Sequence, residues 1–184
     1  MHPDDISHST RYCETHVQYQ PHRFLFCANL YGPTDGFRYG DPILTMNRLF
    51  NYAAQRALRI VGPATIMGDF NRTLCQLEAW PMLQANGWVD TAVLSSAMHG
   101  NELDLTSFDA ARHSFILVNG VLAKSLIQCR TSHEHLFSGH PVLSASFSIS
   151  TLLTPQKVWK LPKSFDRFLH DVDRAEKVAC HTLQ

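Results

Sequence analysis

Apolar and polar positions along the chain form segments of strand and helix length. A continuous apolar run from Arg23 to Leu30 is typical of a strand buried on both faces. From Asp41, a capping carboxylate followed by Pro42, apolar residues recur at helical spacing as far as Gly62. The periodic residues are Leu49, Phe50, Ala53, Ala54, Ala57 and Leu58. Ala64–Met67 then indicates a short buried strand, and this strand–helix–strand order predicts a layered α/β fold.

The middle of the chain predicts shorter elements. Leu74–Asn86 is expected to form a helix that is bent or interrupted at Pro81 and stops at Gly87. Trp88–Thr91 indicates a short strand or turn, and Ser95–Glu102 indicates a polar loop.

Further strands follow in the second half. Leu105–Phe108 and His113–Asn119 are expected to pair as a hairpin. Val121–Gln128 fits either a helix or a strand. Pro141–Ile149 alternates between apolar and polar residues, and its initial proline fits the start of an edge strand.

Three parts of the chain are expected from these patterns. Residues 1–22 form a loose polar lead-in, residues 23–150 an α/β domain, and residues 151–184 a linker and an amphipathic helix. That helix, capped by Ser164, carries the apolar face Phe165, Phe168, Leu169, Val172 and Ala179. An apolar face of this kind favours packing or docking, and we expect a further domain as a partner beyond the linker.

Charge and composition restrict the function classes. Lys plus Arg number 16 and Asp plus Glu number 16, which gives zero formal net charge. A dedicated nucleic-acid-binding protein usually has a basic excess, so any contact with DNA is expected to be local or weak. No apolar run is long enough to span a bilayer, and Met1–Arg11 lacks the apolar centre of a secretory signal. We expect an intracellular protein, nuclear or cytoplasmic, without a membrane segment.

The cysteines and histidines show no metal pattern. The 5 cysteines are scattered and never form a Cys-x-x-Cys pair, so they are expected to be reduced and mostly buried. They are Cys13, Cys27, Cys75, Cys129 and Cys180. His133-Glu134-His135 lacks the helical spacing that puts two imidazoles on one face.

Candidate chemistry collects at three predicted strand ends. Tyr31 follows the first strand, Asp69 and Asn71 follow the second, and His140 precedes the last. Because strand ends in layered α/β folds converge on one crevice, these residues are expected to share a site for phosphate, water or metal. Asp and Asn also cluster in turns for local backbone bonding alone, which is the alternative explanation for Gly68-Asp69-Phe70-Asn71.

Four ordered motifs resemble the endonuclease/exonuclease/phosphatase superfamily. Gly68-Asp69-Phe70-Asn71 coincides with its Gly-Asp-Phe-Asn signature, and Leu30–Pro33 looks like the strand end with its active-site tyrosine. Arg112–Val118 is similar to its Arg-x-Asp-Tyr-Ile-Leu-Val strand, and Ser138–Val142 to its closing Ser-Asp-His-x-Pro-Val element. The resemblance runs from about Arg23 to Ser148 and is greatest to non-LTR retrotransposon endonuclease domains.

The resemblance implies a fold, a reaction and residue roles. The fold would be a partial four-layer α/β sandwich, the second half of that family's fold, with a C-terminal helical extension. Asp69 would orient or deprotonate the attacking water and hold Mg²⁺ or Mn²⁺, and Asn71 would hold a phosphate oxygen. Tyr31 would hydrogen-bond the phosphate, and His140 would stabilise charge developing on phosphorus.

The chain also departs from the family pattern. Ser114 and Gly139 stand where the family has aspartates beside the catalytic histidine, and losing such a carboxylate costs about 10⁴-fold in the serine-protease template. The family's first half, with its metal-binding glutamate, would lie before Arg23, and Glu14 lacks the matching context. A truncated or degenerate DNA phosphodiesterase with little or no activity is therefore expected.

Two alternatives stay open at this point. One is a phosphatase for a small phosphorylated substrate, which zero net charge favours. The other is a non-catalytic binding module. Other polar side chains that could reach the site or nucleic acid are better explained as solvated surface residues: Asp104, Asp109, His133, His135, Lys157, Lys160 and Lys163.

Overall fold

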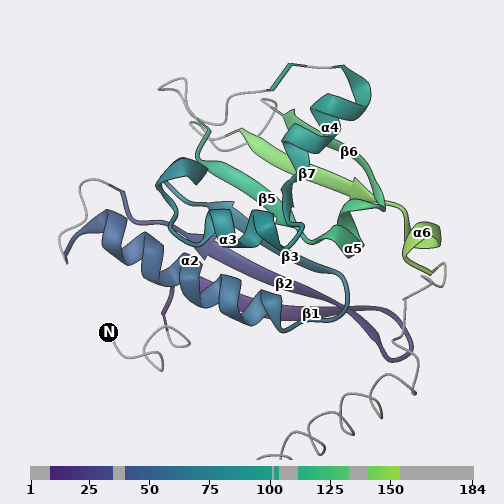
Figure 1. Ribbon diagram of the computed structural model, residues 1–184, viewed down its shortest axis with the longest axis horizontal. Helices are drawn as coiled ribbons and strands as arrows, with labels where there is room; N and C mark the ends of the chain where they lie inside the picture. Colours follow the sequence, from purple (N-terminus) through teal and green to yellow (C-terminus); the bar gives the residue numbers. More distant parts are fainter. Residues whose placement is uncertain (1–8, 35–39, 101, 104–111, 133–140, 154–184) are drawn as a thin grey trace, which may run out of the picture. The chain divides into compact units, whose positions relative to one another are not determined.

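The first unit of the chain is a mixed α/β fold. The computed structural model describes residues 9–34, 40–100, 102–103, 112–132 and 141–153. The chain divides into Met1–Leu153 and Thr154–Gln184, and all described residues belong to the first unit. This unit contains a 5-stranded sheet in the order β1-β2-β3-β5-β4 and a 2-stranded sheet, β6-β7 (Figure 1). The predicted α/β class is confirmed.

The predicted strand–helix–strand unit is present and is parallel. Strand β2 (Arg23–Tyr31) leads through helix α2 (Pro42–Leu58) to strand β3 (Ala64–Asp69), which pairs with β2 in parallel. The Asp41 side chain accepts hydrogen bonds from the Ile43 N–H at 2.8 Å and the Leu44 N–H at 3.3 Å. These bonds satisfy helix donors that would otherwise lack a partner, so the capping prediction is confirmed.

The second half completes both sheets. Strand β5 (Ser114–Val118) pairs antiparallel with β3 and with the short strand β4 (Val89–Asp90). The ambiguous segment after it is both helix and strand, as α5 (Gly120–Ala123) and β6 (Leu126–Ser132). Strand β7 (Val142–Phe147) pairs with β6 as an edge strand, and α6 (Ile149–Leu153) follows.

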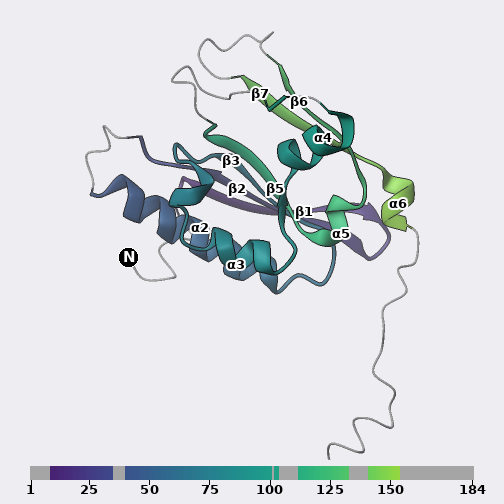
Figure 2. The same cartoon turned by 45° about the horizontal axis from the view of Figure 1, so that its top comes forward.

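The hydrophobic core lies between α2, α3 (Trp80–Ala85) and one face of the large sheet (Figures 1 and 2). The sheet side chains in this core are Phe26, Ala28, Leu30, Ala64, Ile66, Phe115 and Leu117. On the opposite face the register aligns Cys27, Thr65 and Val118, which are also buried. The central strands are therefore covered on both faces there, as the apolar run of β2 predicted.

The prediction of a loose lead-in over residues 1–22 is wrong for Tyr12–Gln20. These residues form strand β1, which pairs antiparallel with β2 from Tyr12↔Leu30 to Gln20↔Arg23. The strand is an edge strand with mostly polar side chains, so its sequence lacks the apolar run that identifies buried strands.

The polar loop predicted at Ser95–Glu102 is also wrong, because Thr91–His99 forms helix α4. Asp90 caps this helix by accepting from the Ala92 N–H at 3.0 Å. Ser95 Oγ accepts from the Cys129 N–H at 2.9 Å, which fixes the helix against β6. Tertiary packing thus overrides the weak helix propensity of its serines.

The single helix predicted over Leu74–Asn86 is two helices. A 3₁₀ helix, η1 (Leu74–Gln76), precedes α3, and Pro81 lies in the first turn of α3 and does not bend a longer helix. Buried Asn47 of α2 donates to the Gln76 carbonyl at 3.3 Å and accepts from the Glu78 N–H at 2.9 Å. Because this side chain binds those backbone groups, they are not used for a continuous helix.

Two cysteine expectations have different outcomes. The described cysteines are free thiols, but Cys13 and Cys75 are exposed, so the expectation of mostly buried thiols is wrong for them.

In the described part of the chain, no helix has the length and apolar character needed to cross a membrane. The predicted strand Leu105–Phe108, most of the hairpin connection Asp109–Arg112 and the C-terminal helix from Ser164 lie outside the described residues.

Candidate active site

Tyr31, Asp69 and Ser114 lie side by side across three neighbouring strands. The register pairs Tyr31 with Asp69 across parallel β2 and β3, and Asp69 with Ser114 across antiparallel β3 and β5. Residues in direct register project from the same face of a sheet. This row lies at the carboxyl ends of β2 and β3, where Tyr31 is 52% exposed. Tyr31 and Asp69 are therefore neighbours at one end of the sheet, and their predicted role in a common site stays a prediction.

A tight turn follows Asp69 and is anchored by Phe70. The Phe70 side chain is fully buried, with ring centroids 5.6 Å from Phe50 and 5.5 Å from Phe115. Its N–H donates to the His113 carbonyl at 2.8 Å. Gly68 has φ +140°, and a Cβ there would come within 1.9 Å of the Leu30 carbonyl oxygen, so only glycine fits.

Asn71 turns back toward the end of β2. Its backbone is left-handed, with φ 49°, a conformation that Asn tolerates better than most residues. Its N–H donates to Asp69 Oδ1 at 3.1 Å, and its Nδ2 donates to the Gly32 carbonyl at 2.8 Å. The Gly32 N–H donates in turn to the Asp69 carbonyl at 2.7 Å. Asp69 and Asn71 are thus fixed both by local turn bonds and by the neighbouring strand end.

Arg11 is a site residue that the sequence analysis missed. Its guanidinium lies over the Tyr31 ring, 5.2 Å from the centroid, and its Nη1 donates to the Gly32 carbonyl at 3.2 Å. A second contact from the same Nη1 to the Tyr31 carbonyl measures 3.4 Å. In the sequence, Arg11 is visible only as a basic residue within residues 1–22, the segment predicted to be a loose lead-in. Pairing of β1 with β2 brings it to the site.

Arg72, the residue after Asn71, adds a second cation beside the turn. It is 8% exposed, and its Nη1 donates to the Asn71 carbonyl at 2.6 Å. Arg11 and Arg72 thus place two guanidinium groups next to Tyr31 and Asn71. Guanidinium groups are strong partners for phosphate oxygens.

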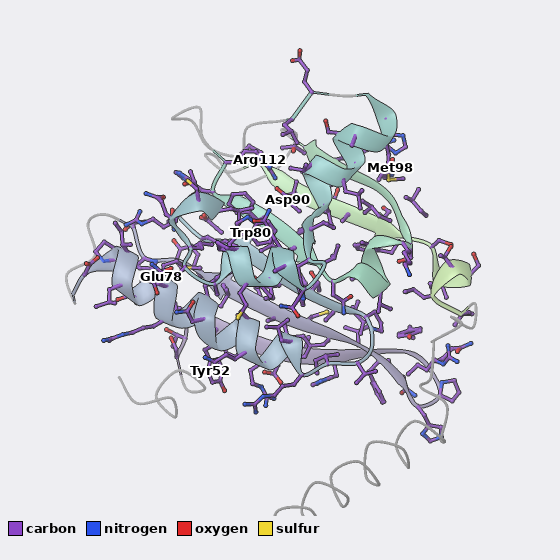
Figure 3. The ribbon with its side chains drawn as sticks, viewed as in Figure 1. Tyr52, Glu78, Trp80, Asp90, Met98 and Arg112 are labelled. Carbon is purple, nitrogen blue, oxygen red and sulfur yellow. The ribbon has the colours of Figure 1, made fainter. Side chains whose placement is uncertain are left out.

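An ion pair fixes the segment that enters β5. Arg112 Nη1 contacts Asp90 Oδ2 at 2.8 Å, and Arg112 Nη2 donates to Asp90 Oδ1 at 3.2 Å (Figure 3). The guanidinium also lies 5.0 Å from the Phe115 ring centroid. Asp90 is 4% exposed and also caps α4, so this pair connects α4 to the strand that carries Ser114.

Two cavities lie elsewhere in the first unit. One, of about 180 Å³, is lined by Ser95, Cys129 and Thr131 among others. The other, of about 340 Å³, is lined by residues that include Trp88 and Gly120. Neither cavity is lined by Tyr31, Asp69 or Asn71. The candidate site therefore lies at the ends of β2 and β3 and not in one of these cavities.

Solved structures share this arrangement of strands and helices. A 3′-5′ exonuclease from Neisseria meningitidis matches with a TM-score of 0.53 and 16% identity, over 67% of this chain and 61% of that chain. The chain has an endonuclease/exonuclease/phosphatase-like fold. The Neisseria enzyme, described as a 3′ phosphatase bound to a product DNA hairpin, also matches with a TM-score of 0.52, 16% identity and the same coverage of both chains, 67% and 61%.

The catalytic domain of Xenopus laevis APE2 has the same fold. It matches with a TM-score of 0.52 and 16% identity, over 67% of this chain and 49% of that chain. This chain therefore spans less than two thirds of the length of each of these solved structures. No family model matches the chain, and no curated protein matches it.

At this strand end, Asp69 is the described carboxylate that could hold a divalent metal ion. No three His, Cys, Asp or Glu side chains in the described part come close enough together to hold one. Glu14 is not a ligand at the site, because it pairs with Arg56 on α2 at 2.7 Å. His140 and Gly139 lie outside the described residues, so their predicted place beside Asp69 stays a prediction.

Proposed function

We propose that this chain is a degenerate phosphodiesterase of the endonuclease/exonuclease/phosphatase superfamily. Its ancestral activity would be hydrolysis of DNA phosphodiester bonds, of the retrotransposon endonuclease type, with weak or no turnover in this chain. One observation carries the proposal. Tyr31, Asp69 and Ser114 are in register at one end of the sheet, and the Asn71 side chain hydrogen-bonds to Gly32 at the same end.

The described side chains suit a phosphate group. The exposed Tyr31 hydroxyl can donate to a phosphate oxygen, and the Asn71 amide has a second N–H beyond the one that Gly32 accepts. The Arg11 guanidinium over the Tyr31 ring supplies positive charge beside it. Asp69 is the acceptor that would take a proton from, or orient, an attacking water.

The same residues explain why turnover is expected to be weak. Ser114 lies directly opposite Asp69, where the resembling family strand has a carboxylate. A serine hydroxyl can hydrogen-bond but supplies no negative charge to stabilise an imidazolium.

Plasmid nicking in the presence of Mg²⁺ or Mn²⁺ tests the activity. We expect nicking close to the background rate, with any residual nicking abolished by EDTA and by Asp69→Ala. Glu78→Ala is the matched control, because it removes an exposed carboxylate from a different part of the fold. Rapid nicking by the wild-type chain that Asp69→Ala abolishes would refute the degenerate state and leave the site assignment intact.

DNA binding tests the site itself. Fluorescence anisotropy with a short DNA duplex should show binding that weakens when Asn71 or Arg11 is replaced by alanine. Binding that is insensitive to EDTA and to all these substitutions would support a binding module with another contact surface.

A phosphatase for a small substrate is the second candidate. Zero net charge favours it, because a small substrate needs no long basic surface. Phosphate release from a panel of sugar, inositol and lipid phosphates, lost in Asp69→Ala and without DNA nicking, would support this function over the first.

A further inference from the structure

Tyr31 presents an aromatic ring at the candidate site. The residue is 52% exposed, although the middle of its strand, Phe26–Ala28, is buried. Contact with a phosphate uses only the hydroxyl, so it leaves the ring without a function in the proposed reaction. Proteins that bind unpaired nucleotides stack the bases on exposed aromatic rings of this kind.

The Arg11 guanidinium covers one face of the Tyr31 ring. Its Cζ lies 5.2 Å from the ring centroid, and its Nη1 donates to the Gly32 carbonyl at 3.2 Å. The Tyr31 N–H donates to the Arg11 carbonyl at 2.9 Å, so the two backbones are also joined. These contacts hold the ring in one orientation before a ligand arrives. Stacking on a ring that is already ordered costs little conformational entropy.

Tyr31 is flanked by Arg11 on one side and by Asp69 on the other. Strand β2 lies between β1 and β3, and Tyr31 is in direct register with Asp69. Neighbouring strands are about 4.8 Å apart, and a tyrosine side chain is much longer than an aspartate, so the ring extends beyond the carboxylate. A nucleotide with its phosphate at Asp69 and Asn71 therefore has its base within reach of the ring.

The surface around this ring carries no carboxylate from β1 or β2. Glu14 is the only acidic residue in the two strands, and it pairs with Arg56 of α2 at 2.7 Å. It therefore lies on the face of the sheet that α2 covers, opposite the face of Tyr31. The next pair in register on the face of Tyr31, Cys13 and Asn29, is exposed. Neither strand therefore repels the backbone of a nucleic acid there.

We propose that Tyr31 and Arg11 form a stacking site for an unpaired nucleobase, so that the chain selects single-stranded over duplex DNA. This inference rests on the proposed function, because the nucleotide is held through its phosphate at Asp69 and Asn71. Bases inside a duplex are stacked and paired, and they must leave the duplex before Tyr31 can reach their faces. Zero net charge also favours a single strand, because stacking supplies affinity that a duplex-binding protein takes from many phosphate contacts.

Fluorescence anisotropy with a short single-stranded oligonucleotide and with a blunt duplex of the same sequence tests the preference. We expect the wild type to bind the single strand at least about fivefold more tightly. Tyr31→Leu removes the ring and should lose this preference. Tyr31→Phe keeps the ring and should keep the preference, although loss of the hydroxyl weakens binding of both DNAs. Phe24→Leu is the matched control, because it removes a 45% exposed ring from the other face of the same strand and should bind like the wild type.

The outcomes separate the stacking site from the proposed function. Equal affinity for single strand and duplex, with both weakened by Asn71→Ala, would overturn the stacking site and leave the phosphate site intact. A single-strand preference that Tyr31→Leu retains would also overturn the stacking site. No binding of either DNA, or binding unchanged in Asn71→Ala, would refute the proposed function and the stacking site together.

An abasic strand of the same length tests the stacking directly. It keeps the phosphates of the oligonucleotide but has no base to stack. Removing the bases should weaken binding to the wild type at least about fivefold and binding to Tyr31→Leu clearly less, because the ring and the base contribute only together. Wild-type binding that is unchanged by removal of the bases, or equal losses in the two chains, would overturn the proposal.

Discussion

Asn71 is fixed to Gly32: the side-chain Nδ2 donates to the Gly32 carbonyl oxygen at 2.8 Å. Asn71→Asp should lower the free energy of unfolding by about 1–3 kcal/mol, because a carboxylate cannot donate and would face a carbonyl oxygen. Asn71→Gly loses the same bond but tolerates the φ of 49° without strain, so it should be less destabilised. Urea denaturation measures both, and equal stability of Asn71→Asp and wild type would contradict the bond's importance.

Arg11 should matter for DNA binding through both its charge and its planar shape. Arg11→Ala is expected to weaken DNA affinity, because it removes the cation over Tyr31 and the donor to Gly32. Arg11→Lys keeps the charge but not the planar group, so it should restore only part of the affinity. Anisotropy at low and high salt distinguishes the two effects, since the charge contribution falls with salt. If Arg11→Lys binds DNA with the full wild-type affinity, the positive charge alone accounts for the contribution of Arg11.

Asp90 and Arg112 should be strongly coupled in stability. Removing either partner alone leaves a poorly solvated charge, so Asp90→Ala and Arg112→Ala should each cost about 3 kcal/mol or more. The double variant should cost clearly less than the sum of the two, because no unpaired charge remains. Chemical denaturation of the three variants completes the cycle. Additive costs would mean that the 2.8 Å contact contributes little.

Gly32 should be intolerant of any side chain. A Cβ at Gly32 would lie 1.9 Å from the Phe70 carbonyl oxygen, so Gly32→Ala must force the β2 and β3 ends apart. We expect a cost of several kcal/mol and loss of DNA binding. Gly100→Ala is the matched control: it has open space and only its φ of +69° to oppose alanine, which costs about 1–2 kcal/mol. Thermal unfolding of both variants provides the comparison.

The Glu14–Arg56 pair should make stability depend on acid pH. The hydrogen bond from Arg56 lowers the pKa of Glu14 below its ordinary value of 4.5. Its contribution is therefore present above about pH 4.5 and is lost as the pH falls through the lower folded-state pKa. The effect should stay below about 1 kcal/mol, because the Arg56 side chain is 44% exposed. The Tm difference between wild type and Glu14→Gln should shrink on acidification, and a constant difference would contradict the pair's role.

Burial and local chemistry made part of the fold predictable. The apolar run of β2, the Asp41-Pro42 cap and the apolar stripe of α2 each act within one segment, so their patterns survive in the sequence. The Gly-Asp-Phe-Asn turn also follows from local properties, since Gly68 requires a positive φ and Asn71 tolerates one. These features determined the α/β class and the candidates Tyr31, Asp69 and Asn71.

Only the tertiary structure decided which strands pair and which distant side chains come into contact. Strand β1 is polar because it lies at an edge, and Arg11 reaches Tyr31 only through that pairing. Helix α4 depends on a cap from Asp90 and on packing against β6, and Asn47 ends η1 from a distant helix. Such contacts join residues far apart in the chain and have no periodic signal. The sequence alone therefore determined the α/β class and named Tyr31, Asp69 and Asn71 as candidates, because these signals are local. The pairing of distant strands decided that Arg11 and Ser114 lie beside them, because no local pattern encodes such contacts.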